Sequence, residues 1–166
     1  PSDDRLYRTD SDPSTTKPEF HAIAIVDKFS RWPMAFPLRS INAKAVCDAL
    51  LQVFMTFLIP KVISSDCGSN FTSKLTQEFL KRLGCSPRFN TPGHPEASGL
   101  VERCNQSLKA MIYKLAQSDP RGWHKLLPFV LWSLREKHSS TTHISPYTLV
   151  YGTLPKGPLS VLKECW

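Results

Sequence analysis

Residues 21–38, HAIAIVDKFSRWPMAFPL, contain two short apolar runs that decide the fold class. The first run is rich in β-branched side chains, and its length is typical of a buried strand. Ser30 and Arg31 interrupt the pattern, and a second strand is expected from Trp32 onward. Two such runs with a short polar break between them predict a hairpin.

Helical patterns and further short strands follow this hairpin along the chain. Asn42 suits the cap position of a helix that ends before Pro60, and Gly84 suits the end of a later helix. The later helix would turn Leu75 inward, and residues 93–99 are expected to form a loop. The expected strands cover residues 20–30, 32–39, 61–66 and 86–92, and the expected helices cover about 42–59, 73–83, 99–117 and 122–137. This order predicts an α/β fold with a central mixed sheet flanked by helices.

The length of 166 residues suits one domain with one sizeable core. Residues 1–19 are polar and are expected to form an N-terminal arm or a degenerate first strand. Residues 20–166 would form the globular core. The chain starts at Pro1 rather than Met, as a piece of a longer protein would. It has no run of eighteen apolar residues, so no membrane span is expected.

The charge of the chain is uneven. The net charge is +7, with −2 in residues 1–19 and +9 in residues 20–166. A basic globular part suits a polyanionic partner, although a charge that only aids solubility would give the same balance. The five cysteines form no CxxC pair and have no zinc-ligand spacing with the five histidines, so we expect reduced, intracellular thiols.

Asp66 follows an apolar strand and precedes a Cys-Gly-Ser-Asn turn that ends at Asn70. Ligand-binding and catalytic groups gather at the carboxyl ends of such strands. An aspartate in this position can also simply accept hydrogen bonds from the backbone of the turn. Taken alone, Asp66 leaves both interpretations open.

Thirty-five residues separate Glu102 from Asp66, and Glu102 would lie in the first turn of a long helix. The helix dipole by itself favours a carboxylate there. At about 100° per residue, Asn105, Gln106 and Lys109 fall within roughly 60° of Glu102 around the helix. This polar stripe places a carboxylate, two amides and a cation on one face, as an ordinary amphipathic helix also would.

Paired carboxylates on separate elements are what metal-dependent phosphodiester chemistry needs. Negative charge develops on both the attacking and the leaving oxygen, and two divalent cations about 4 Å apart can stabilise both. Mg²⁺ prefers hard oxygen ligands in octahedral geometry. Asp66 and Glu102 are therefore the candidate metal ligands.

Four segments resemble the integrase core of LTR retroelements, particularly the Pol proteins of gypsy-class retrotransposons. They are HAIAIVDKFSRWPMAFPL, SSDCGSNFTSKLTQEFLKRLG, RFNTPGHPEASGLVERCNQSLKAMI and THISPYTLVYGTLPKGPL. The resemblance covers about residues 20–166 and implies an RNase H-like fold. It implies that Asp66 and Glu102 are the second and third carboxylates of an acidic triad that binds two Mg²⁺ or Mn²⁺ ions. The implied reactions are trimming of 3′ ends by water and attack of the new 3′-hydroxyl on target DNA.

The first carboxylate of the triad departs from the family pattern, because no apolar strand precedes residue 20. Asp10 leaves fifty-five residues before Asp66, a spacing similar to the family's, and we choose it over Asp12 and Asp4. If none of these completes the triad, the chain would be an inactive or domesticated module that binds DNA or a partner.

The resemblance also implies partners. Asn105 and Lys109 match helix positions that approach viral DNA, and Arg103 is a further candidate DNA contact. Asn70 and residues 94–98 match a flexible region beside the active site. The expected partners are the ends of the retroelement DNA, target DNA and further copies of the chain. The expected location is the nucleus or a retroelement particle.

Overall fold

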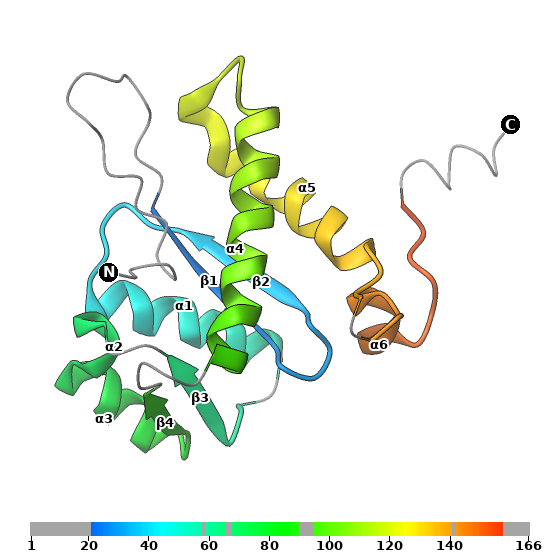
Figure 1. Cartoon of the computed structure of the whole chain (residues 1–166). Coiled ribbons are helices and arrows are strands. Elements are labelled where there is room, and N and C mark those ends of the chain that lie inside the picture. Colours follow the sequence, from blue (N-terminus) through cyan, green and yellow to red (C-terminus); the bar gives the residue numbers. More distant parts are fainter. Residues whose placement is uncertain (1–20, 58, 66–67, 90–94, 141, 158–166) are drawn as a thin grey trace, which may run out of the picture.

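A two-stranded antiparallel hairpin forms the middle layer of the protein. The computed structural model describes residues 21–57, 59–65, 68–89, 95–140 and 142–157, with only the backbone described for residues 95–98. Strand β1 (Ala22–Val26) pairs with β2 (Pro33–Pro37), as the sequence predicted. Figure 1 shows α4 crossing one side of this hairpin while α1 passes on the other.

The two faces of the hairpin differ in the size of their side chains. Ala24 stands opposite Ala35 on one face, and Ile23 stands opposite Phe36 on the other. Because side chains alternate across a strand, small residues gather on one face and large residues on the other. Both faces are covered, since Ile23 is 0% exposed and Ala24 is 6% exposed.

The face with large side chains packs against α1 (Ala43–Thr56) and α3 (Lys74–Arg82). Asn42 caps α1 as predicted, because its Oδ1 accepts a hydrogen bond of 2.8 Å from the backbone of Ala45. The cluster contains Ile23, Met34, Val46, Leu50, Phe54 and Leu80. Alternation along the strands and helical spacing along α1 thus meet in one apolar layer.

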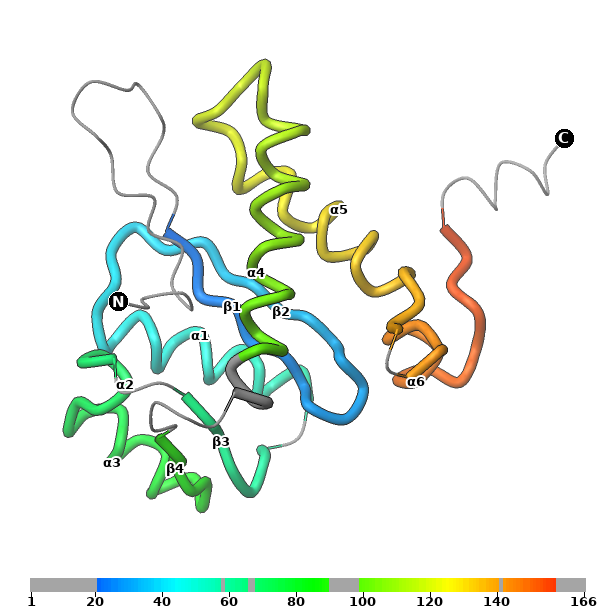
Figure 2. The backbone as a smooth tube through the Cα atoms, viewed as in Figure 1, coloured from blue at the N-terminus to red at the C-terminus, as the bar shows by residue number. Residues whose placement is uncertain are grey.

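The alanine face packs against α4 (Pro95–Leu115) and α5 (Trp123–Glu136), which the short 3-10 helix η1 (Pro120–Gly122) precedes. Leu108 is 1% exposed and Val130 is 1% exposed within this second cluster. Alanine side chains allow a helix to approach a sheet closely, because they add little volume between the two backbones. The path of the chain from α4 to α5 and then to α6 (Pro146–Tyr151) can be followed in Figure 2.

Arg135 fixes the end of α5 to the start of β2. Its Nε and Nη2 donate hydrogen bonds of 3.3 and 3.0 Å to the carbonyl oxygen of Pro33, and its guanidinium lies 4.3 Å from the ring centre of Trp32. Burial lowers the pKa of Arg135 from its ordinary value. Its hydrogen bonds and its contact with the aromatic ring offset that cost.

A second pair of strands is parallel, and the residues of the candidate site follow its two strands in the sequence. Strand β3 (Val62–Ser65) pairs with β4 (Ser86–Phe89), so the described strands form one antiparallel and one parallel pair. The short helix α2 (Ser69–Thr72) lies between β3 and α3. The mixture of pairings with helices on both sides agrees with the predicted α/β class.

Four local predictions need correction. Helix α4 begins at Pro95 rather than near residue 99, because proline is well suited to the first helical turn, and so residues 95–98 are not a loop. Residues 69–72 form α2 rather than a simple turn, and α1 ends at Thr56 rather than near Ile59. Leu75 is 55% exposed, because it lies in the first turn of α3, beyond the packed layer.

No helix in the described part of the chain is long and apolar enough to cross a membrane. Gly84 ends α3 as predicted, with a positive φ of 71° that favours glycine. The predicted arm or degenerate strand at residues 1–19 lies outside the described residues.

Ala24 provides a test of the close packing between the hairpin and α4. We expect Ala24→Leu to lower the free energy of unfolding by about 1 to 3 kcal/mol, since three extra carbons must fit into a filled layer. Urea denaturation measures the effect, and Ala110→Leu on the exposed side of α4 is the matched control. Equal effects of the two substitutions would show that this face is not tightly packed.

Candidate functional site

The parallel pair β3·β4 brings two chemically important segments to one edge. Ser65 stands opposite Phe89 in the register, so both strands reach their carboxyl ends together. Asp66 is the next residue after β3, and α4 begins six residues after Phe89. Asp66 itself lies outside the described residues. The chain therefore leads toward Asp66 and toward α4 from the same edge of the sheet, where ligand sites of α/β proteins occur.

Glu102 lies on α4 about two turns beyond the start of the helix, and its side chain is exposed. At 1.5 Å per residue, it stands about 10 Å along the helix from Pro95. Leu108 and Ile112, about 120° and 80° around the helix from Glu102, are buried against the alanine face of the hairpin. Packing of α4 thus leaves the Glu102 carboxylate accessible to ligands from outside.

The polar stripe of α4 is only partly exposed. Gln106 is exposed and Lys109 is partly buried, whereas Asn105 is only 4% exposed. Asn105 belongs to the polar stripe of Glu102 by helical angle, but the helix packs further around toward that side and buries it. Arg103 is exposed next to Glu102. Its role as a DNA contact stays a prediction, as does that of Lys109.

A buried threonine anchors the segment that follows Asp66, which contains Asn70 in helix α2. Thr76 is 0% exposed, and its Oγ1 donates a hydrogen bond of 2.7 Å to the carbonyl oxygen of Asn70. The Ser73 hydroxyl donates a hydrogen bond of 3.2 Å to the same oxygen and lies 3.0 Å from Thr76 Oγ1. The thiol of Cys47 on α1 approaches Thr76 Oγ1 at 3.9 Å. Thr76 therefore joins the turn to the interior of the protein.

The sequence did not single out Thr76. The sequence feature that could have revealed it is a serine cap at Ser73 followed three positions later by a polar residue on the apolar side of α3. Because α2 and α3 are adjacent, the buried Thr76 hydroxyl on α3 can donate a hydrogen bond to a backbone carbonyl of α2. This contact makes Thr76 a positioning residue for the segment beyond β3.

The described part of the chain supplies one of the three predicted metal ligands. A group of three or more His, Cys, Asp or Glu side chains that could hold a metal ion does not occur among the described residues. Asp10 and Asp66 lie outside these residues, so the predicted triad can be judged only at Glu102. An exposed carboxylate at that position fits a hard divalent cation.

Cys104 occupies the other side of α4 and faces a cleft between α4, the hairpin and the end of α5. Burial raises the pKa of the Cys104 thiol to about 11. Burial also raises the pKa values of the Cys47 and Cys85 thiols. These three cysteines are free thiols in the described part of the chain.

The layered fold with its parallel edge is found in retroviral integrase catalytic cores. The integrase catalytic core domain of HTLV-2, solved with magnesium in a trimeric form, superposes with a TM-score of 0.69 at 21% identity, covering 86% of this chain and 88% of that one. A chain of the simian T-cell lymphotropic virus intasome superposes with a TM-score of 0.74 at 22% identity, covering 86% of this chain and 53% of that one. These likenesses establish the RNase H-like fold.

The sequence comparison gives the family. The model of the integrase core domain matches residues 9–95, more than half of the chain. The chain belongs to the integrase core domain family, in the group found in retroviruses and LTR retroelements. It is 38% identical to the Gag-Pol polyprotein of walleye dermal sarcoma virus over 156 residues, 90% of this chain. It is 33% identical to the Pro-Pol polyprotein of simian foamy virus type 3 over 132 residues, 80% of this chain.

The chain spans only a small part of these relatives, 9% of the walleye virus polyprotein and 12% of the foamy virus polyprotein. The chain therefore matches one small part of each of these much longer relatives. The resemblance inferred from the four sequence segments is confirmed, and the roles of individual site residues stay predictions.

Replacing Thr76 by valine removes the hydroxyl but keeps the shape of the side chain. We expect the free energy of unfolding to fall by about 1 to 2 kcal/mol, since a buried hydrogen bond to Asn70 is lost. Urea denaturation measures this change, and Thr76→Ser, which keeps the hydroxyl, is the control. A valine variant as stable as the native protein would show that the hydroxyl does not anchor the turn.

The raised pKa of Cys104 predicts slow alkylation. A thiol that titrates two units above its ordinary value of 9.0 has roughly 100-fold less thiolate at about pH 8. We expect iodoacetamide to modify Cys104 slowly in the folded protein and at an ordinary rate after denaturation, as followed by peptide mass spectrometry. The pKa of Cys104 is higher in the folded protein than in the unfolded chain. The neutral thiol therefore contributes to the free energy of unfolding below about pH 9, and this contribution is lost as the pH rises toward 11. Fast modification at about pH 8 would contradict the buried environment.

Proposed function

We propose that this chain is the catalytic core of a DNA strand transferase that inserts retroelement DNA into target DNA. One arrangement carries the proposal: the strand leading to Asp66 and the helix bearing Glu102 leave the same sheet edge in an integrase-family fold. The solved HTLV-2 integrase core contains magnesium. We extend that metal dependence to this chain because carboxylates are hard oxygen ligands.

The proposed chemistry consists of two displacements at phosphorus. A water molecule first cleaves the retroelement DNA near its 3′ end and leaves a free 3′-hydroxyl. That hydroxyl then attacks a target phosphodiester: a new P–O bond forms to it, the target's P–O3′ bond breaks, and the leaving 3′-oxygen takes up a proton. Neither step forms a covalent bond to the protein.

Three carboxylates would hold the metal ions: Asp10, Asp66 and Glu102. Two bound Mg²⁺ or Mn²⁺ ions would lower the pKa of the attacking hydroxyl or water and neutralise charge on the leaving oxygen. Helix α4 would keep the Glu102 carboxylate in place through the buried contacts of Leu108 and Ile112. The anchored turn at Asn70 would limit movement of the chain after Asp66.

DNA would bind mainly through its phosphates. Arg103 is exposed and Lys109 partly exposed on α4, and both side chains could reach a phosphate near Glu102. The burial of Asn105 makes it a less direct contact than the sequence suggested. Strand transfer at two DNA ends would require more than one copy, and the HTLV-2 core is solved in dimeric and trimeric forms. We place this activity in the nucleus or in a retroelement particle.

Glu102→Gln tests the catalytic proposal. The substitution keeps the size of the side chain and removes its negative charge, so we expect Mg²⁺-dependent strand transfer on labelled oligonucleotides to fall at least about 100-fold. DNA affinity should change little. Glu78→Gln on the exposed surface of α3 is the matched control and should keep full activity.

Two results would contradict the proposal. Strand transfer by Glu102→Gln at the native rate would show that this carboxylate is not a metal ligand. A native chain that binds DNA without any strand transfer or disintegration activity would instead identify a non-catalytic DNA-binding module.

A further inference from the structure

A basic cleft opens on the side of α4 that faces away from Glu102. It has a volume of about 210 Å³ and lies between the turn of the β1–β2 hairpin, α4, and the segment that follows α5. At about 100° per residue, Leu100 and Ser107 lie roughly 160° and 140° around α4 from Glu102. The cleft therefore opens mainly on the side of α4 away from Glu102, and Arg103, about 100° around the helix from Glu102, lies between the cleft and the proposed catalytic edge.

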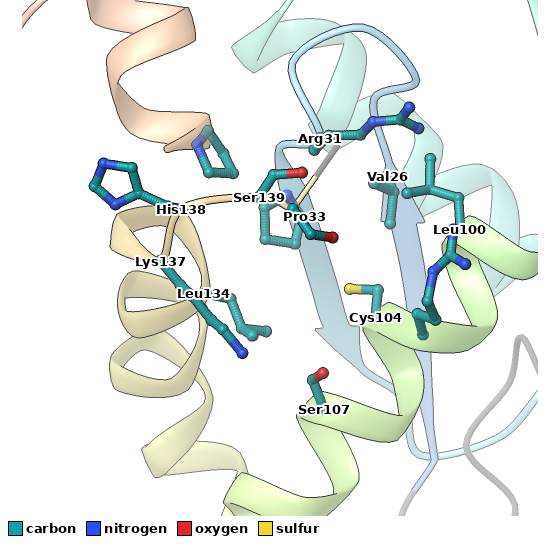
Figure 3. Close-up of a pocket in the computed structure, with 13 residues that line it drawn as sticks. Val26, Arg31, Pro33, Leu100, Cys104, Ser107, Leu134, Lys137, His138 and Ser139 are labelled. Carbon is teal, nitrogen blue, oxygen red and sulfur yellow. The ribbon is translucent and has the colours of Figure 1, made fainter. Parts of the chain in front are cut away.

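The polar residues that line the cleft are basic or carry hydroxyl groups, and the rest of the lining is apolar, with Val26, Leu100 and Leu134. They include Arg31, Arg103, Lys137 and His138, together with Ser107 and Ser140, and none of the lining residues is acidic. Figure 3 shows Lys137 and Ser107 extending into the space between α5 and α4, with His138 turned outward. Cys104 also faces the cleft.

Arg31 has an unused hydrogen-bond donor at this cleft. Its Nε is buried and has no hydrogen-bond partner among the described residues. Buried guanidinium donors in folded proteins are normally paired with an acceptor. The carboxylate of Asp27, in the same turn, accepts hydrogen bonds of 2.7 Å from both the backbone N–H and the hydroxyl of Ser30. Because this Nε is buried, an acceptor in the cleft would meet it only after the Arg31 side chain moved.

The backbone at Arg31 is strained. Its φ of 62° lies in the left-handed region, which arginine rarely adopts. The turn maintains it, since the Arg31 N–H donates a hydrogen bond of 2.9 Å to the Asp27 carbonyl oxygen and the Asp27 N–H donates one of 3.1 Å to the Trp32 carbonyl oxygen. Arg31 thus lines the cleft with a strained backbone and with a buried Nε that has no partner among the described residues.

We propose that this cleft binds a phosphate group of duplex DNA, as a second contact remote from Glu102. Guanidinium, ammonium and hydroxyl donors together suit the oxygens of a phosphate. The volume is below the range of about 300 to 1,000 Å³ typical of sites for whole small molecules, and it suits a single phosphate group. The choice of a DNA phosphate rests on the proposed function. The same chemistry would accept free phosphate, which the second experiment distinguishes.

The first experiment measures how DNA affinity depends on salt. We compare the native chain with the double variant Arg31→Gln/Lys137→Gln by fluorescence anisotropy of a labelled duplex over a NaCl series. Loss of one phosphate contact should weaken binding and reduce the slope of log K against log salt by about 0.9. The control is Lys28→Gln/Lys125→Gln, which removes the same charge from exposed positions outside the cleft.

Two results would overturn the proposal that the cleft contacts DNA. In one, the double variant keeps the native slope of log K against log salt; in the other, the control loses as much slope as the double variant. Thermal unfolding of each variant shows whether it is folded. Lys137→Gln alone is the second variant, because Lys137 is an exposed residue at the end of α5 and tolerates substitution. A smaller loss of slope in this single variant also supports the proposal.

The second experiment follows the backbone amide signals of the native chain by NMR. Titration with the duplex should shift the signals of Arg31, Ser139 and Ser140, and Arg31→Gln/Lys137→Gln should abolish those shifts. Shifts with inorganic phosphate but none with the duplex would overturn the DNA assignment. Glu102→Gln should keep the duplex-induced shifts while losing strand transfer, so a failure of the catalytic proposal remains distinguishable from a failure of this one.

Discussion

The contact between α4 and the alanine face of the β1–β2 hairpin is the interaction on which the rest of the structure depends. Ala24 and Ala35 leave room for the buried side of α4, and Leu108 and Ile112 fill that room. This contact fixes the rotation of α4 about its own axis. The rotation in turn decides which residues of the helix are accessible, with Glu102 exposed on one side and the basic cleft on the other.

Two separate packing systems position the proposed site. The hairpin and its two helical layers fix α4, whereas the parallel pair β3·β4 and the hydrogen bonds of Thr76 fix the chain on either side of residue 66. Catalysis by carboxylates on different elements requires that both systems stay rigid, because metal ligands must hold their geometry to a fraction of an ångström. The hydrogen bond from Thr76 to Asn70 therefore supports the proposed site, because it holds the chain that follows residue 66.

Much of the fold could be predicted from sequence, because it rests on local patterns. The strand runs around Ile23 and Met34, the cap at Asn42 and the stop at Gly84 each have a physical signature within a few residues. The errors arose where tertiary packing decides. Helical angle placed Asn105 in the polar stripe of Glu102, and it did not reveal that the neighbouring layer covers this residue. That the Arg31 Nε has no partner in the described part of the chain could not be predicted either, since this depends on residues distant in sequence.

The central claim is that Glu102 on α4 and Asp66 after β3 hold metal ions together. Anomalous diffraction from crystals of this chain grown with Mn²⁺ tests it most directly, because the ion itself is located without reference to activity. The account predicts manganese peaks bound by the carboxylates of both Asp66 and Glu102, with Asp10 completing the coordination of one ion. Peaks that avoid Glu102, or no peak at that edge of the sheet at saturating Mn²⁺, would contradict it.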